Sequence, residues 1–210
     1  MKYLLGALFA CLLVWLSLGA GAQEKPVAAV HPKTAIFAGG CFWCMQPSFD
    51  RAAGVIKTEA GYSGGHVVKP TYEQVSRGDT GHMEVIAVTY DPAKISYQQL
   101  LDIYWTTIDP IDAEGQFCDR GSQYASAIFY ADEAEHKIAL ESKMLLEADD
   151  ERFGGKPILT KILPTAPFYV AEEYHQSYYK KNSLRYRFYR SRCGRDERLE
   201  KVWGDKAAKH

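Results

Sequence analysis

Short apolar segments recur along this 210-residue chain between stretches of glycine, proline and polar residues. Apolar runs of this length, several with polar residues at alternate positions, predict β-strands. They cover residues 34–38, 55–62, 83–91, 124–131 and 156–165. The last of these runs contains two prolines. We therefore expect it near the edge of a sheet, where a missing backbone donor does least harm.

Four other segments place their apolar residues at helical spacing and predict α-helices. They cover residues 41–54, 96–108, 132–148 and 169–181. Gly54 is suited to end the first helix and Ser96 to cap the start of the second. Residues 63–82 are rich in glycine and polar residues, and we expect a long functional loop there. Strands and helices alternate without a strict repeat, which predicts an α/β (α+β) domain with a mixed central sheet packed by helices.

The N-terminus has the composition of a secretory signal peptide over residues 1–22. Lys2 precedes a long apolar run, and the small residues Ala20, Gly21 and Ala22 follow that run. We expect cleavage there and an exported protein, periplasmic or secreted, with no stable membrane association afterwards. An uncleaved anchor is the alternative, although the apolar run is short for a membrane span.

Composition and charge fit one globular domain after the signal. Hydrophobic residues make up 47% of the chain and the formal net charge is −1, so a sizeable core is expected and nucleic acid is not a general partner. We expect an arm over 23–33, the domain over 34–204, a tail over 205–210 and a monomer. Residues 185–198 interleave arginine with aromatic residues, a pattern also seen in nucleic-acid binding. In a slightly acidic, exported chain we expect this segment to pack on the domain.

Two cysteines, Cys41 and Cys44, enclose Phe42 and Trp43 directly after a pair of glycines. A strand, a glycine turn and a helix start would place Cys41 at the positive end of a helix. We therefore expect a lowered thiol pKa and a reactive thiolate at Cys41. The bulky residues between the cysteines would serve as walls of an apolar pocket beside the sulfur.

Two alternatives use the same cysteines. A C-x-x-C motif at a helix start is also typical of general thiol–disulfide oxidoreductases. A zinc site built from Cys41, Cys44, Cys118 and Cys193 is less favoured, because only one pair is closely spaced. We expect no metal. The fifth cysteine, Cys11, would leave with the signal.

Six motifs occur together and in order: "GCFW", "GYSGG", "PTYEQVSRGDTGHMEV", "YDP", "DRGSQYASAIF" and "EEYHQ". They resemble the A-type peptide methionine sulfoxide reductases over roughly residues 34–182. The resemblance implies a two-layer α/β sandwich that reduces the S epimer of methionine sulfoxide, free or in oxidised proteins. It implies no cofactor and a thioredoxin-like reductant. Cys44 stands where the family usually has glycine, and Gln46 where it usually has glutamate. The stretches "GQFCDRG" and "RSRCGRDERLEKVWG" are found in only part of the family.

The resemblance assigns the sulfoxide step to Cys41 and Glu84. The Cys41 thiolate would attack the sulfoxide sulfur and become a sulfenic acid. Glu84 would be the acid that protonates the departing oxygen, which requires a carboxyl pKa raised by an apolar setting.

Five further positions match the family's binding residues. Tyr72 and Tyr124 would bind the sulfoxide oxygen through their hydroxyls, and Asp119 would orient the site. Phe42 and Trp43 would form the apolar pocket for the S-methyl group.

The cysteine that resolves the sulfenic acid has three candidates. Cys44 lies one helical turn from Cys41. Cys193 is supported by relatives that resolve with a C-terminal cysteine, and nearby arginines would lower its pKa. Cys118 adjoins Asp119. Three complete pairings are possible, and a structural bridge between Cys118 and Cys193 would leave Cys44 as the resolver.

Three other polar residues have ordinary structural interpretations. Glu172 and His175 share a predicted helical face but have no further ligands nearby in sequence. His82 is interpreted as a loop hydrogen-bonding residue rather than as a base.

Overall fold

A computed structural model describes residues 31–208, and the predicted signal peptide lies outside them. Its main feature is a six-stranded sheet with the order β7-β6-β1-β3-β2-β8. The strands are β1 (Lys33–Gly39), β2 (Val55–Ser63), β3 (Met83–Tyr90), β6 (Ser126–Tyr130), β7 (Lys161–Pro164) and β8 (Tyr169–Val170). Only β6 and β7 run parallel, while the other neighbours are antiparallel. The predicted mixed sheet is therefore confirmed.

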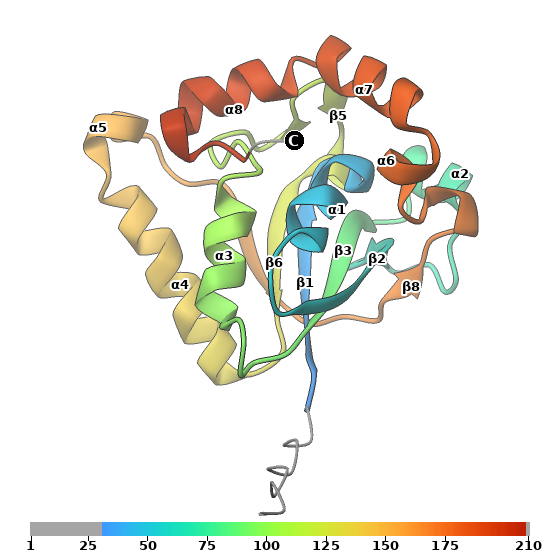
Figure 1. Cartoon of the computed structure of the whole chain (residues 1–210), viewed down its shortest axis with the longest axis horizontal. Helices are drawn as coiled ribbons and strands as arrows, with labels where there is room; N and C mark the ends of the chain where they lie inside the picture. Colours follow the sequence, from blue (N-terminus) through green and yellow to red (C-terminus); the bar gives the residue numbers. More distant parts are fainter. Residues whose placement is uncertain (1–30, 209–210) are drawn as a thin grey trace, which may run out of the picture.

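Helices cover one face of the sheet and one of its ends. They are α1 (Phe42–Asp50), α2 (Tyr72–Ser76), α3 (Tyr97–Trp105), α4 (Glu133–Glu147), α5 (Asp150–Phe153), α6 (Tyr178–Lys181), α7 (Ser183–Arg192) and α8 (Arg195–Trp203). Figure 1 shows α1, α3 and α4 in front of the sheet, with α7 and α8 running across the end where β1 finishes. A small hairpin of β4 (Gly115–Gln116) and β5 (Asp119–Arg120) lies at the same end.

The alternation of strand residues divides the core into two layers. Phe37 and its register partners Ile86 and Ile128 are fully buried beneath the helices. The neighbouring residues on the opposite face are also buried, where Leu163 of β7 and Phe168 of the β7–β8 connection pack against them. Both faces of the sheet are thus covered, which explains why its central strands are almost continuously apolar.

A glycine turn connects β1 to α1 and fixes the position of Cys41. A Cβ atom at Gly39 would lie 2.5 Å from Sδ of Met45, and Gly40 has a φ of +79°, which disfavours other residues. Cys41 is the N-cap of α1, so the strand ends and the helix begins within two residues. This close approach holds the first turn of α1 at the end of the sheet.

Two predicted elements were wrong in detail. The predicted helix 169–181 is instead the edge strand β8, a short 3₁₀ turn (Glu173–His175) and α6. Contacts with β2 replace the helix. Tyr169 and Val170 pair with β2, and the Gln176 side chain bonds to both the N–H and the C=O of Ala60. The expected loop 63–82 contains α2, whose N-cap Thr71 forms a capping box with Gln74.

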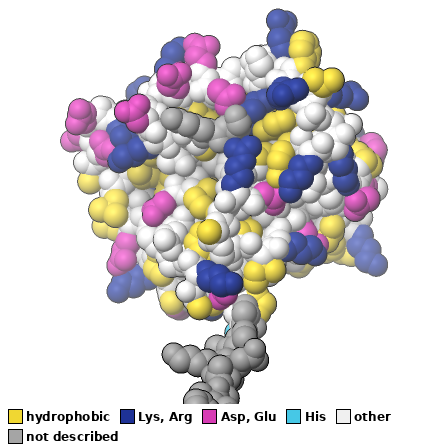
Figure 2. Space-filling model, viewed as in Figure 1, with side chains coloured by type: hydrophobic (Ala, Val, Ile, Leu, Met, Phe, Trp, Pro, Cys, Tyr) yellow, Lys and Arg dark blue, Asp and Glu magenta, His cyan; other side chains and the backbone are white. Residues whose placement is uncertain are grey.

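The C-terminal segment packs on the domain, as expected. Leu199, Val202 and Trp203 of α8 are buried in the main core, and Trp203 Nε1–H donates to the carbonyl of Ile108 at 2.8 Å. Other basic residues remain at the surface, and Figure 2 shows Lys and Arg side chains gathered over the α6–α7 side of this face. Between residues 31 and 208, no helix has both the length and the apolar composition to span a membrane.

We predict that Trp203→Ala destabilises the fold by about 3–5 kcal/mol, because it empties a buried aromatic site and leaves the Ile108 carbonyl unpaired. Urea unfolding measures this change. Glu200→Ala, on the exposed side of the same helix, is the control and should stay within about 0.5 kcal/mol of wild type. Equal stabilities for the two variants would contradict the anchoring role of α8.

Candidate active site

A small cavity of about 80 Å³ lies where β1 ends and α1 begins. Its lining contains all seven residues that the resemblance assigns to sulfoxide chemistry and binding, together with Tyr189. The eight residues are Cys41, Phe42, Trp43, Tyr72, Glu84, Asp119, Tyr124 and Tyr189. They come from α1, α2, α7, β3, β5 and the 3₁₀ turn Ser122–Tyr124, so the fold gathers segments that are distant in sequence.

Cys41 and Cys44 form a buried dithiol in the first turn of α1. Both are free thiols, and their exposed fractions are 6% and 1%. A hydrogen bond from Cys41 lowers the pKa of Cys44 to about 7, with further lowering by Arg195 and Arg190. Burial raises the pKa of Cys41, and the neighbouring Cys44 and Glu84 add to this effect. The expected lowering of the Cys41 pKa is therefore wrong, because burial and the neighbouring acidic groups raise it, and the lowered pKa of the coupled pair falls on Cys44.

The other two cysteines form a disulfide. Cys118 and Cys193 lie 4.9 Å apart at their Cα atoms and connect the β4–β5 hairpin to the end of α7. The predicted effect of nearby arginines on the pKa of Cys193 was wrong, since this sulfur does not titrate and the arginines act on Cys44 instead. Of the four cysteines considered, only Cys41 and Cys44 are left to exchange electrons directly.

The four-cysteine zinc site does not fit this arrangement. One group of metal-ligating side chains comes together in the described part of the chain, namely Cys118, Asp119 and Cys193. Its two sulfurs are bonded to each other and cannot act as thiolate ligands.

Glu84 lies near the start of β3 with only 3% of its surface exposed. Its Oε2 accepts the backbone N–H of Phe42 at 3.0 Å, which connects the carboxyl to the first turn of α1. Burial raises its pKa to about 8, against the lowering effect of the Phe42 hydrogen bond. The carboxyl is therefore mostly protonated at neutral pH and can donate a proton.

Two phenols and a carboxylate complete the polar side of the cavity. Burial and the nearby Glu84 raise the pKa of Tyr72 to about 12, and they also raise the pKa of Tyr124. Both hydroxyls therefore stay protonated and can donate hydrogen bonds. Asp119 accepts a 2.6 Å hydrogen bond from the hydroxyl of Tyr189, while burial raises the pKa of its carboxyl.

Two tyrosines that the sequence did not single out, Tyr178 and Tyr189, hold the ring of Trp43 in place together with His175. Trp43 stacks on Tyr178 with a centroid distance of 3.8 Å and an interplanar angle of 8°. Its Nε1–H donates to Nδ1 of His175 at 2.9 Å, and Tyr189 meets its ring edge-on. With fourteen tyrosines in the chain, no local signal separates Tyr178 and Tyr189 from ordinary packing residues.

Glu172 and His175 support the site rather than react in it. Glu172 accepts the backbone N–H of Tyr72 and the hydroxyl of Tyr62, both at 2.8 Å. The shared helical face expected for Glu172 and His175 is absent, because they lie in and beside a 3₁₀ turn. His82 bonds to the backbone of Gly65 and Val67, which confirms its loop role.

In this cavity the Cys41–Cys44 pair, which can form a thiolate, lies beside the neutral carboxyl of Glu84 among aromatic rings. Such a site is suited to redox chemistry on sulfur. Fold and site together define a thiol-dependent oxidoreductase.

Comparison with known proteins gives the family. The model of the family described as peptide methionine sulfoxide reductase matches residues 33–207. The peptide methionine sulfoxide reductase MsrA of Limosilactobacillus reuteri is 51% identical over 170 residues, covering 81% of this chain and 96% of the relative. MsrA 2 of Rhizobium meliloti is 42% identical over 207 residues, covering 99% of this chain and 96% of the relative.

Solved structures agree with this assignment. Reduced Mxr1 from Saccharomyces cerevisiae superimposes with a TM-score of 0.68 at 32% identity, over 76% of this chain and 90% of that chain. Methionine sulfoxide reductase A of Corynebacterium diphtheriae gives a TM-score of 0.67 at 31% identity, over 77% of this chain and 78% of that chain. The chain belongs to the peptide methionine sulfoxide reductase family, in its A-type branch. It is therefore a peptide-methionine (S)-S-oxide reductase, an oxidoreductase.

The raised pKa of Glu84 predicts a pH-dependent gain in stability for Glu84→Gln. The carboxyl titrates near 4.5 when unfolded and at about 8 when folded. Between these values the folded protein holds a proton that the unfolded chain has lost, so wild-type stability falls as pH rises. The Glu84→Gln variant has no titrating group at this position, so its stability does not fall with pH for this reason. Its advantage should grow up to about pH 8 and reach the order of a few kcal/mol, because each pKa unit is worth about 1.4 kcal/mol.

Denaturant unfolding of the reduced protein at several pH values measures this difference. The exposed Glu73→Gln variant is the control and should differ from wild type by no more than about 0.5 kcal/mol. A stability difference between Glu84→Gln and wild type that does not change with pH would show that Glu84 titrates normally in the folded protein.

Proposed function

We propose that this chain reduces the S epimer of methionine sulfoxide, free or in proteins, with Cys41 as nucleophile and Glu84 as general acid. The observation that carries the proposal is that the dithiol and the proton-bearing Glu84 line one cavity of about 80 Å³. A sulfoxide is a poor electrophile until its oxygen receives a proton. A thiolate and an acid in the same enclosed space supply both requirements.

The first step would transfer the sulfoxide oxygen from methionine sulfoxide to Cys41. The proton shared by the dithiol moves to Cys44 as the Cys41 thiolate attacks the sulfoxide sulfur. Glu84 gives its proton to the oxygen, the sulfur–oxygen bond of the substrate breaks, and the hydroxyl ends on Cys41. The products are methionine, a sulfenic acid on Cys41 and ionised Glu84, so atoms and charge balance.

The remaining residues would bind and orient the substrate. The phenols of Tyr72 and Tyr124 are protonated donors that can hold the sulfoxide oxygen as negative charge develops on it. The rings of Phe42 and Trp43 offer an apolar wall to the S-methyl group. Asp119, held by Tyr189, would orient this arrangement.

Cys44 is the proposed resolving cysteine, because Cys118 and Cys193 are already bonded to each other. Its sulfur attacks the Cys41 sulfenic acid, a Cys41–Cys44 disulfide forms, and water leaves. A thioredoxin-like dithiol then donates two electrons and returns the pair to its reduced state. Yeast Mxr1 has been solved in complex with Trx2.

The acid beside the dithiol argues against a general thiol–disulfide oxidoreductase. Thiol–disulfide exchange removes no oxygen and gives the buried, protonated Glu84 no task, whereas sulfoxide reduction requires a proton on the departing oxygen. A methionine side chain that ends in a small methyl sulfoxide fits the cavity better.

We further propose that the chain is an exported monomer that repairs oxidised proteins outside the cytosol. The signal-like residues 1–22 support export. The Cys118–Cys193 disulfide is a second support, since such bonds persist in oxidising compartments. A thioredoxin-like partner would then have to be exported as well.

Removing single cysteines tests the resolving step. Cys41→Ser should form no methionine. Cys44→Ser should release about one methionine per enzyme and then stall with thioredoxin as reductant, because its sulfenic acid cannot form the Cys41–Cys44 disulfide. The control is Cys118→Ser/Cys193→Ser, which should keep cycling. Continuous cycling by Cys44→Ser with stalling of the control would transfer the role to the C-terminal pair.

Glu84→Ala should slow the first methionine-forming turnover by about 10²- to 10⁴-fold, the usual contribution of general acid catalysis. Glu84→Gln should recover part of this loss, because an amide donates a hydrogen bond without delivering a proton. Rapid-quench single-turnover assays isolate this step from slow disulfide reduction. A wild-type rate for Glu84→Ala would exclude Glu84 and leave oxygen activation to the two tyrosines.

The same assay has a pH signature. The wild-type rate should rise as the thiol pair ionises near pH 7 and fall as Glu84 loses its proton near pH 8. Glu84→Gln should keep the rising limb and lose the falling one, since no proton remains to titrate at that position. A falling limb that persists in Glu84→Gln would assign it to another group.

A further inference from the structure

Arg195 is buried at the start of α8 without a counter-charge. Its exposed fraction is 1%, and it forms no ion pair with any carboxylate among residues 31–208. Its Nη2 donates to the carbonyls of Gly39 and Thr107 at 3.1 and 2.8 Å, while its Nε–H has no hydrogen-bond partner. The neighbouring arginines differ, because Arg190 pairs with Asp196 and Arg198 with Asp109.

An unpaired buried guanidinium is expensive. Its removal from water costs several kcal/mol. The carbonyl groups and the ring of Phe117, whose centroid lies 4.3 Å from Cζ of Arg195, stabilise the cation but bring no full negative charge. Deprotonation is no escape, because arginine keeps its charge in proteins. A fold that retains Arg195 in this place therefore needs a negative charge close to it in at least one state of the protein.

The contacts of Arg195 surround the dithiol. Gly39 precedes Cys41 by two residues, and Met45, whose Sδ lies 3.5 Å from Nη2, follows Cys44 directly. A Cβ atom at Gly40 would lie 3.5 Å from Nη1 of Arg195, so the guanidinium fills the space behind the glycine turn. The side chain thus lies under the first turn of α1, where both sulfurs are located.

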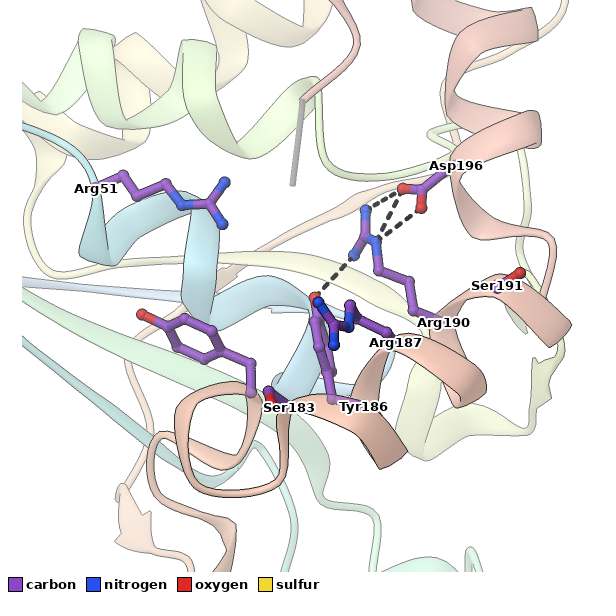
Figure 3. A pocket seen from close by; sticks show the side chains of 8 residues that line it. Arg51, Ser183, Tyr186, Arg187, Arg190, Ser191 and Asp196 are labelled. Atoms are coloured by element: carbon purple, nitrogen blue, oxygen red, sulfur yellow. Dashed lines mark hydrogen bonds and ion pairs between the residues drawn. The ribbon is translucent and has the colours of Figure 1, made fainter.

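The charged and titratable groups that act on the dithiol come from six elements. They are Tyr72 of α2, Glu84 of β3, Asp119 of β5, Tyr124 of the 3₁₀ turn, Tyr186, Tyr189 and Arg190 of α7, and Arg195 of α8. Only the two arginines are cationic. Figure 3 shows Arg190 lying between the hydroxyl of Tyr186 and the carboxylate of Asp196, which already balances its charge. Arg195 is the remaining cation, and among residues 31–208 it has no carboxylate as an ion-pair partner.

We propose that Arg195 is the counter-ion of the thiolate formed by the Cys41–Cys44 dithiol and acts as a positioning residue that controls its charge. The role assigned to the dithiol rests on the proposed function, but its ionisation does not. Arg195 also lowers the pKa of Cys44 more than Arg190 does, in agreement with this geometry.

A redox consequence follows from the same charge. Reduction of the Cys41–Cys44 disulfide takes two electrons and one proton and leaves one thiol and one thiolate. A dithiol reductant supplies two electrons and two protons, of which one stays on Cys41 and the other enters the solvent. Arg195 is without a counter-ion in the disulfide and gains one in the reduced pair, so it favours reduction.

The ionisation of the dithiol tests the proposal directly. We compare Arg195→Gln, which keeps donors for the carbonyls of Gly39 and Thr107, with Arg195→Lys, which keeps the charge. The exposed Lys201→Met variant of the same helix controls for loss of one positive charge. All are made in the Cys118→Ser/Cys193→Ser background, and the ultraviolet absorbance of the thiolate is followed as pH rises. A companion Cys44→Ser protein identifies the signal of the pair.

Arg195→Gln should raise the first ionisation of the dithiol by about 1 pKa unit or more, whereas Arg195→Lys and Lys201→Met should leave it close to wild type. Above both midpoints, the disulfide of Arg195→Gln should be about tenfold harder to reduce in equilibrium with dithiothreitol, because each unit of thiolate stabilisation is a factor of ten. Near-ultraviolet circular dichroism verifies that each variant is folded.

Wild-type titration of folded Arg195→Gln would overturn the proposal and would indicate that the cation serves Asp119 instead. If Arg195→Gln does not fold, Arg195→Lys provides the test. This variant keeps the positive charge, so a first dithiol pKa well above the wild-type value would contradict a counter-ion role. The titration needs no turnover. If the wild-type protein reduces methionine sulfoxide but Arg195→Gln leaves the ionisation of the dithiol unshifted, only this inference is rejected. If Arg195→Gln shifts the ionisation but the wild-type protein shows no turnover, only the proposed function is rejected.

Discussion

The hydrogen bond from the Phe42 N–H to the carboxyl of Glu84 joins the first turn of α1 to strand β3 at the end of the sheet. It places the protonated carboxyl of Glu84, the proposed acid, beside Cys41, the proposed nucleophile. It depends on the close approach of strand and helix that Gly39 and Gly40 allow. A bulkier residue at Gly39 would push the first turn of α1 away from β1. The cavity, its acid and its dithiol therefore share one backbone constraint.

Burial favours the neutral form of both the Glu84 carboxyl and the two thiols, whereas the proposed reaction needs a neutral carboxyl and an ionised thiol. Two arginines separate the two pKa values. Arg190 and Arg195 lower the pKa of Cys44, while the pKa of Glu84 on β3 stays raised by burial. One enclosed space can thus hold an acid and a thiolate-forming pair near neutral pH.

Sequence patterns predicted the elements whose signals are local. The helices over 96–108 and 132–148 have regular apolar spacing and N-caps at Ser96 and Asp132, and both are present. Residues 169–181 show the limit, since pairing of β8 with β2 overrode their helical pattern. Seven of the eight cavity-lining residues were found through motifs. The eighth, Tyr189, and the supporting Tyr178 are defined only by tertiary contacts, among them those with Trp43.

The pKa values of Cys41 and Cys44 could not be predicted from their place at a helix start. Burial is the largest cause at Cys41, and the arginines that lower the pKa of Cys44 come from elsewhere in the chain. Arg195 is more than 150 residues away in sequence from the glycine carbonyl that it contacts. The Cys118–Cys193 disulfide holds this distant segment in place, since Cys118 adjoins Asp119 and Cys193 lies one turn beyond Tyr189 on α7. Two of the four cysteines among residues 31–208 therefore connect the segments around the cavity, while Cys41 and Cys44 are left as the free thiols for the proposed redox cycle.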